Sequence, residues 1–252
     1  MNPTKDLKIL LIQLRLDESM IPIERAGFVA SSGLAERHWE TLDVFRNPDF
    51  QPAVLDNYDA FVIGGLSDDP SDTTEMPPFF EPWLQNLFRL MQYGIEIKKP
   101  GLLSCGGFML ASHMLGAEIV IDPDQRELGI YTLTLSDIAK NDILFKTLPN
   151  EFKAVSGHIK STNTLPSNCE LLVSSERCPI HGFKVKNAPF YAFQFHPEIQ
   201  CKDLEIRVTL YKEKYFETEE AYLEFIANMA DTSIANSIVV RFLTLVEHHK
   251  SS

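Results

Sequence analysis

Apolar stretches rich in β-branched residues alternate with helical periodicity over the first half of the chain. Residues 8–14 form a continuous apolar run with the length of a strand buried on both faces, and residues 58–65 form a second that ends in two glycines. Apolar side chains recur at helical spacing over residues 79–93, and a third short apolar run covers residues 101–105. Strands that alternate with helices predict a parallel sheet with helices on both faces.

The connections and the second half of the chain complete this pattern. A polar loop with prolines is predicted at residues 66–78, and a helix at 108–115 that ends at Gly116. From about Gln125 onward, short strand-like segments separated by turn residues predict a more antiparallel half of the sheet. These segments cover residues 130–135, 152–155, 170–173, 183–185 and 190–195. After Cys201 the spacing is helical. We therefore predict an α/β domain over residues 1–200, with a helical C-terminal extension at 201–252 packed on the same domain.

Composition narrows the class of protein. The 252 residues are 44% hydrophobic and carry a formal net charge of −12, which excludes a wholly disordered chain and argues against a nucleic-acid-binding role. No window approaches the roughly 18 consecutive apolar residues of a membrane span. The N-terminus leads into a strand-like run without a cleavage signal. We expect a soluble cytoplasmic protein that contacts neither membrane nor nucleic acid.

The chain has four cysteines, too few for a disulfide framework in a chain of this length. They form no C-x-x-C pair and no Cys/His cluster with zinc-finger spacing, so we expect no structural metal and no cofactor. Three of them are expected to be structural or incidental: Cys169, Cys178 and Cys201. Cys105 differs because of where it stands.

Cys105 falls where a predicted strand passes into a predicted helix, within the sequence Leu-Ser-Cys-Gly-Gly-Phe-Met at residues 103–109. A nucleophile on such a sharp turn is exposed above the edge of the sheet, and backbone N–H groups at the helix start can lower the pKa of its thiol. Gly106 and Gly107 leave room for the turn. The alternative for this segment alone is a buried structural cysteine.

A second motif, Gln-Phe-His-Pro-Glu, occupies residues 194–198. In an extended segment, residues i and i+2 project to the same side, so Glu198 can orient the ring of His196. With Cys105, these two side chains would make a nucleophile, base and orienting acid. Gly65 follows another strand, and its N–H could join that of Gly106 in an oxyanion hole.

These segments resemble the class I (triad-type) glutamine amidotransferases, particularly stand-alone proteins similar to the glutaminase domain of GMP synthetase. The family elbow, Gly-Ile-Cys-x-Gly-x-Gln, corresponds to residues 103–109, and the Gln-Phe-His-Pro-Glu signature is matched to the letter. The glycine pair falls at Gly64 and Gly65. The resemblance covers roughly residues 7–200 in the family's order.

The resemblance implies a Rossmann-like, flavodoxin-like sheet flanked by helices. It further implies that Cys105 attacks the side-chain amide carbon of glutamine or of a γ-glutamyl compound. His196 would move the proton, Glu198 would hold His196, and Gly65 and Gly106 would stabilise the oxyanion. The product would be a γ-glutamyl thioester that water releases.

Departures from the family pattern fall in the expected substrate pocket. The Gln that ends the family's elbow is Met109 here, and a thioether cannot replace a carboxamide's donors and acceptor. The lost hydrogen bond would weaken glutamine binding by about 1.5–3 kcal/mol. Gly64 and His158 are the other substrate-binding candidates; His158 resembles a family histidine at the glutamine site, but a solvent-facing loop histidine is the alternative.

Two functional hypotheses remain open. The chain contains no phosphate-binding loop of the Gly-x-x-x-x-Gly-Lys-Ser/Thr type, so an acceptor or synthetase subunit would have to be a separate partner. The first hypothesis is a cysteine-nucleophile amidase. The second is a catalytically silent regulatory or binding protein on the same fold. A cysteine peptidase or deglycase-like hydrolase is disfavoured, because its histidine usually follows the nucleophile closely.

Overall fold

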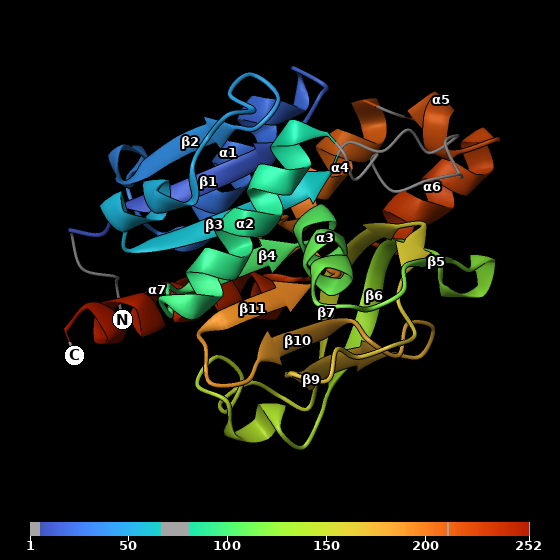
Figure 1. The fold of residues 1–252 in the computed structure, drawn as a ribbon. Helices are drawn as coiled ribbons and strands as arrows, with labels where there is room; N and C mark the ends of the chain where they lie inside the picture. The colour runs from blue at the N-terminus through green and yellow to red at the C-terminus, as the bar shows by residue number, and fades with distance from the viewer. Residues whose placement is uncertain (1–5, 67–80, 211, 252) are drawn as a thin grey trace.

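The computed structural model describes residues 6–66, 81–210 and 212–251 (Figure 1). The polar loop predicted at residues 66–78 therefore lies, from residue 67 onward, outside the described residues, as does the start of the helix predicted at 79–93. The described part of that helix runs from Pro82 to Glu96.

A nine-stranded sheet forms the centre of the described part of the molecule. Five adjacent strands are parallel, in the order β2 (Trp39–Asp43), β1 (Ile9–Leu14), β3 (Ala60–Leu66), β4 (Gly101–Ser104) and β11 (Phe190–Phe193). The antiparallel half continues with β10 (Gly182–Val185), β9 (Cys169–Ser175), β6 (Glu127–Leu135) and β7 (Glu151–His158). A small separate sheet pairs β5 (Val120–Ile121) with β8 (Lys160–Ser161).

The predicted α/β class with a mixed sheet is thus confirmed. The segment at residues 190–195 was expected among the antiparallel strands, and the structure shows a double role for it. Its strand β11 pairs antiparallel with β10 but parallel with β4, so it joins the two halves of the sheet. The sequence patterns singled out neither β2 nor the helix between β1 and β2, since both carry mixed polar and apolar residues.

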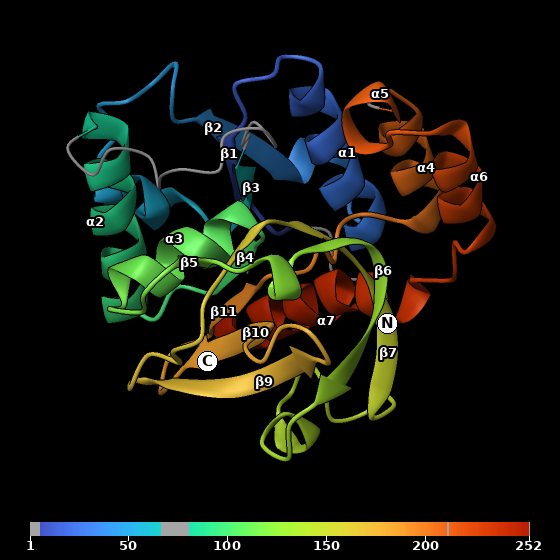
Figure 2. The same cartoon turned by 90° about the vertical axis from the view of Figure 1, so that its right-hand side faces the viewer.

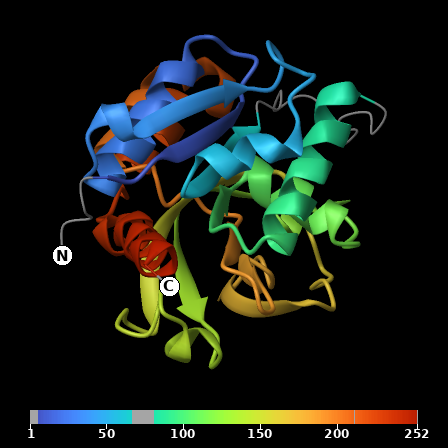
Figure 3. The same ribbon diagram turned by 60° about the vertical axis from the view of Figure 1, so that its left-hand side comes forward.

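Helices cover both faces of the sheet (Figures 1 and 3). Helices α1 (Met20–Ser32) and α7 (Ser233–Lys250) lie on one face, and α2 (Pro82–Glu96) and α3 (Gly106–Met114) on the other. Three shorter helices, α4 (Cys201–Leu210), α5 (Lys212–Tyr215) and α6 (Glu219–Ala227), group together beside α1 (Figure 2). Short 3-10 helices lie at Glu36–His38, Pro52–Asn57, Pro123–Gln125 and Ala139–Asn141.

Side-chain alternation along the central strands builds two apolar cores. Leu102 faces the core beneath α1 and α7, whereas the next residue, Leu103, faces the core beneath α2 and α3. Both side chains are fully buried, as expected for a parallel strand covered by helices on both sides. Among the described residues, no helix has the length and apolar character that crossing a membrane requires.

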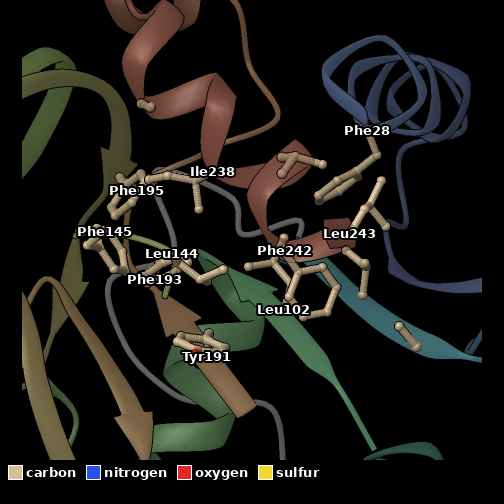
Figure 4. Close-up of a cluster of buried hydrophobic side chains, with 14 of the residues drawn as sticks. Phe28, Leu102, Leu144, Phe145, Tyr191, Phe193, Phe195, Ile238, Phe242 and Leu243 are labelled. Carbon is tan, nitrogen blue, oxygen red and sulfur yellow. The ribbon is translucent and has the colours of Figure 1, made fainter. Parts of the chain in front are cut away.

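The C-terminal helix α7 is part of the first core. Figure 4 shows Ile238, Phe242 and Leu243 from α7 packed together with Phe28 from α1 and Phe193 from β11. At the end of α7, the ammonium of Lys250 contacts the carbonyl of Asp6 at 3.1 Å and the carboxylate of Asp59 at 3.0 Å.

We predict that Phe242→Ala lowers the free energy of unfolding by about 3–5 kcal/mol, because it leaves a cavity in a core that cannot collapse easily. Leu223→Ala is the control, since Leu223 on α6 is 56% exposed; it should change stability by no more than about 0.5 kcal/mol. Urea denaturation of both variants measures the difference, and equal losses would contradict a core role for α7.

Candidate active site

The turn between β4 and α3 places Cys105 in an uncommon backbone conformation. Cys105 has φ 48° and ψ −99°, outside the helical and extended regions that L-residues prefer. Its N–H donates to the carbonyl of Phe193 on β11 at 2.8 Å, and its carbonyl accepts the N–H of Met109 at 3.0 Å. These bonds hold the residue between strand and helix with its side chain partly exposed. Backbone strain of this kind clusters at functional sites.

Close backbone packing explains the glycines that follow Cys105. A Cβ on Gly106 would lie 2.1 Å from the backbone nitrogen of Leu66, and a Cβ on Gly107 would lie 3.0 Å from the carbonyl oxygen of Ile63. The start of α3 therefore packs directly against the end of β3 with no space for side chains. This packing brings the two segments predicted to form the oxyanion hole into contact.

His196 and Glu198 form the hydrogen-bonded pair that the sequence predicts, with Nδ1 of His196 2.7 Å from Oε1 of Glu198. A carboxylate next to Nδ1 keeps the proton on that atom and leaves Nε2 for Cys105. Burial alone lowers the pKa of His196, but the charges of Glu198 and Cys105 and the hydrogen bonds to them raise it to about 9. The three side chains of the predicted triad are thus brought together.

The chain around Glu198 is fixed from two helices. The hydroxyl of Ser31 on α1 donates to the carbonyl of Glu198 at 3.2 Å. The amide of Asn236 on α7 donates to the carbonyls of Pro197 and Ile199, each at 2.9 Å. On the other side, the N–H of His196 donates to the carbonyl of Val155 at 2.9 Å. The position of the carboxylate therefore depends on the C-terminal helix.

A buried ion pair that the sequence patterns did not reveal lies beside Gly65. Arg15 contacts Oε1 of Glu24 through Nε at 2.9 Å and through Nη2 at 2.8 Å. The same Oε1 accepts the N–H of Gly65 at 3.0 Å. A Cβ on Gly65 would fall 2.2 Å from Nη2 of Arg15, and one on Gly64 would fall 2.5 Å from the Glu24 carboxyl. The glycine pair is therefore required by the ion pair, and the N–H of Gly65 is engaged by a carboxylate.

The pKa of Arg15 also depends on the charges of Cys105 and Glu198, two residues of the predicted triad. Burial alone lowers the pKa of Arg15, but Glu24, Cys105 and Glu198 together raise it above its usual value. The sequence does contain one indication of the Arg15–Glu24 pair. Glu24 lies on the same face of α1 as Met20 and Phe28, where a helix normally buries an apolar residue, so a charged residue there indicates a buried partner.

The side chains of two substrate-binding candidates, Met109 and His158, are buried. Met109 is 3% exposed and packs in the core beneath α2 and α3. The ring of His158 is buried, with Nδ1 at 3.1 Å from the carbonyl of Lys160 and Nε2 at 3.4 Å from Glu127. Gly157, the preceding residue, presents its carbonyl 3.7 Å from Sγ of Cys105. Substrate contact by Gly64, Met109 and His158 stays a prediction.

A mixed sheet flanked by helices, a cysteine at a strained strand-to-helix turn and a buried histidine–carboxylate pair define the class: an α/β protein with a candidate cysteine nucleophile. The family model "Glutamine amidotransferase class-I" matches residues 33–210. The chain belongs to the class I glutamine amidotransferase family.

Comparisons with individual proteins agree with this assignment. The chain is 31% identical over 114 residues to a glutamine-hydrolyzing GMP synthase subunit from Pyrococcus abyssi, covering 45% of this chain and 58% of that protein. It is 30% identical over 118 residues to the corresponding GMP synthase subunit from Methanocaldococcus jannaschii, covering 47% and 61%. The matches thus span about three fifths of the length of these relatives.

Solved structures extend the likeness in fold to nearly the whole chain. A glutamine amidotransferase from Thermotoga maritima superposes with a TM-score of 0.73 at 16% identity, covering 96% of this chain and 98% of that one. A glutamine amido transferase from Methylobacillus flagellatus gives 0.72 at 17% identity, covering 96% and 94%. At these identities the likeness establishes the fold, and the C-terminal helices are within it.

We predict that Cys105 is alkylated at pH 7–8 at least about tenfold faster than the other cysteines. The pKa of His196 is raised from 6.5 to about 9, so the imidazolium that stabilises a thiolate at Cys105 is present below pH 9 and lost above it. Burial raises the pKa of the Cys169 and Cys178 thiols to about 12, and the pKa of Cys201 is also raised.

Iodoacetamide labelling followed by peptide mass spectrometry measures the four rates. Cys201 is the internal control, because it is partly exposed like Cys105. His196→Gln should slow labelling of Cys105 and leave that of Cys201 unchanged. Labelling of Cys105 at the rate of Cys201 in the unmodified protein would argue against a working nucleophile.

We also predict that Arg15→Met lowers the free energy of unfolding by about 3–5 kcal/mol, because it leaves the Glu24 carboxylate buried without its cation. Adding Glu24→Gln to that variant should restore much of the loss, since the amide oxygen still accepts the N–H of Gly65. Arg46→Met is the control: its partner Glu18 is 80% exposed, and the loss should stay below about 1 kcal/mol. A double variant no more stable than Arg15→Met would contradict the buried-charge account.

Proposed function

We propose that the protein is an amidase that hydrolyses the side-chain amide of glutamine or of a γ-glutamyl compound with Cys105 as nucleophile. The observation that carries this proposal is the 2.7 Å pair of His196 and Glu198, with Cys105 on a strained turn and close enough to raise the pKa of His196. Family membership supports the same reaction. The buried carboxylate fixes the tautomer and orientation that a general base requires.

The first chemical step forms a thioester. The thiolate of Cys105 attacks the amide carbon, and the carbonyl oxygen becomes an oxyanion. His196, protonated in the resting ion pair, gives its Nε2 proton to the leaving ammonia as the C–N bond breaks. Water then attacks the thioester carbon while His196 accepts one of its protons, and the C–S bond breaks. The thiolate of Cys105 is re-formed beside the imidazolium, and the product leaves as a carboxylate after giving its acid proton to solvent.

Stabilisation of the oxyanion is assigned to the backbone N–H groups of Gly106 and Gly65. The N–H of Gly65 is donated to Glu24 in the structure, so it has to be released from that carboxylate before it can serve the reaction. Rotation of the peptide before Gly65 or a movement of Glu24 would accomplish this. Substrate binding that favours the released form would couple recognition to catalysis.

The destination of the ammonia is part of the proposal. The relatives from Pyrococcus abyssi and Methanocaldococcus jannaschii are, by name, subunits of a glutamine-hydrolyzing GMP synthase, which supports a separate acceptor or synthetase partner for this chain. Such a partner would receive ammonia from the site. We further expect the protein to act in the cytoplasm, without nucleic acid or membrane.

A second candidate is a regulatory or binding protein with a silent triad. Two observations favour it: the N–H of Gly65 is engaged by Glu24, and Met109 stands where the family has Gln. Both would weaken turnover of free glutamine without altering the fold.

We predict that the purified protein releases ammonia and glutamate from glutamine or from γ-glutamyl peptides, and that Cys105→Ser abolishes the release. Cys201→Ser is the matched control and should retain full activity.

Coupled glutamate dehydrogenase detection measures turnover across the substrate panel. Turnover of γ-glutamyl peptides but not of free glutamine would make the protein a γ-glutamyl hydrolase. No turnover of any substrate, together with slow alkylation of Cys105, would overturn the amidase proposal in favour of a binding protein.

A further inference from the structure

Three buried side chains from separate strands converge next to the triad, and the proposed reaction uses none of them as an acid or base. Glu127 is the first residue of β6, His158 is the last residue of β7, and His181 directly precedes β10. Figure 2 shows β6 and β7 side by side at one end of the sheet. One ligand atom from each residue lies within 4.8 Å of the others, and all three residues are buried.

The hydrogen-bond pattern of His158 leaves a lone pair facing a carboxylate. Its Nδ1 lies 3.1 Å from the carbonyl oxygen of Lys160, which can only accept, so Nδ1 carries the proton. In the neutral ring, Nε2 is then unprotonated and lies 3.4 Å from Oε2 of Glu127. Among the described residues, this Nε2 has no hydrogen-bond partner. Two electron-rich atoms therefore face each other in the interior, where such an arrangement is costly.

The outer contacts of His158 and Glu127 resemble those of metal ligands. Metal-bound histidines usually donate their other ring N–H to a backbone carbonyl or carboxylate, as His158 does to Lys160. The second oxygen of Glu127, Oε1, accepts the hydroxyl of Ser175 at 2.5 Å and leaves Oε2 directed at the two rings. An ion about 2.0–2.2 Å from each ligand holds tetrahedral neighbours about 3.3–3.6 Å apart, a range that includes the Glu127–His158 distance.

We propose that Glu127, His158 and His181 form a site for one divalent transition-metal ion, with zinc the best chemical fit. Two imidazole nitrogens and one carboxylate oxygen suit zinc and its neighbours. His181 now contacts Oε2 through Nε2 at 2.7 Å, so its ring shifts slightly and its proton moves to Nδ1 when the ion binds. This assignment gives His158 a role different from the substrate contact that the family resemblance implies.

Occupancy of this site would fix the strands around the nucleophile. Gly157 precedes His158, and its carbonyl lies 3.7 Å from Sγ of Cys105. The carbonyl of His181 accepts the N–H of Gln194, two residues before His196. The ion would therefore position the segment around Gly157 and the segment around Gln194 without contacting the substrate. The sequence shows no zinc-finger spacing of Cys and His because the three ligands are far apart in the chain and come together only through the sheet.

The test measures metal binding, independently of activity, in the full chain carrying Cys105→Ala so that the thiol cannot hold the metal. The chelator-treated protein is titrated with Zn²⁺ and with Co²⁺, and metal content, melting temperature and the visible cobalt spectrum are recorded. The expected result is one equivalent of metal per chain, a rise in melting temperature, and X-ray absorption showing nitrogen and oxygen ligands without sulfur.

The diagnostic variant is His158→Asn, which keeps a donor toward the Lys160 carbonyl and removes the ligand nitrogen. It should weaken zinc binding by at least about a hundredfold, since loss of an outer-shell partner alone costs up to that much. His38→Asn is the matched control, because Nδ1 of His38 makes the same kind of bond to the carbonyl of Leu7 at 2.9 Å. It should bind zinc as the parent does.

Three results would overturn the proposal. One is a folded parent protein that binds less than a stoichiometric amount of zinc and cobalt. Another is equal zinc affinity in the His158→Asn and His38→Asn variants. The third is sulfur ligation in the X-ray absorption spectrum. If His158→Asn fails to fold, the ligand set seen by X-ray absorption in the parent decides the question alone. Because Cys105 is absent throughout, a failed amidase assay has no bearing on this outcome.

Discussion

The contact between the start of α3 and the end of β3 is the constraint on which the site depends. Gly106 lies so close to Leu66 that a Cβ would overlap its backbone nitrogen, and this approach holds Cys105 at positive φ between strand and helix. A bulkier residue at Gly106 would separate the two backbones. Cys105 would then lose its position relative to His196, which follows a different strand.

Two cationic groups interact with Cys105. The imidazole of His196 has its pKa raised to about 9 by Glu198 and Cys105, and the guanidinium of Arg15, which is bound to Glu24, also has its pKa raised by Cys105. Each cation is paired with a buried carboxylate, so none of these charges lacks a counter-ion, as burial demands. The same pairing makes the site sensitive to single changes, because removing one member leaves its partner unpaired in the interior.

The helices after residue 200 are integrated with the active site. Asn236 holds the carbonyls on both sides of Glu198, and Phe242 fills the core beneath the strand that leads to His196. Residues from α4 and α6 pack against Val155 and Ile199, next to the same segment. A helix distant in sequence therefore positions the segment around Glu198 through hydrogen bonds from an Asn236 side chain to backbone carbonyls.

The sequence by itself predicted the strands β1, β3 and β4, the helices α2 and α3, and Cys105, His196 and Glu198 as the candidate triad. Strand burial leaves continuous apolar runs, and a strained turn and an i, i+2 pair leave short local motifs. Only the tertiary structure decided the engagement of Gly65 by Glu24, the burial of Met109, and the meeting of Glu127 with His158 and His181. These features join side chains separated by tens of residues, and their spacing depends on strand order, which no local pattern encodes.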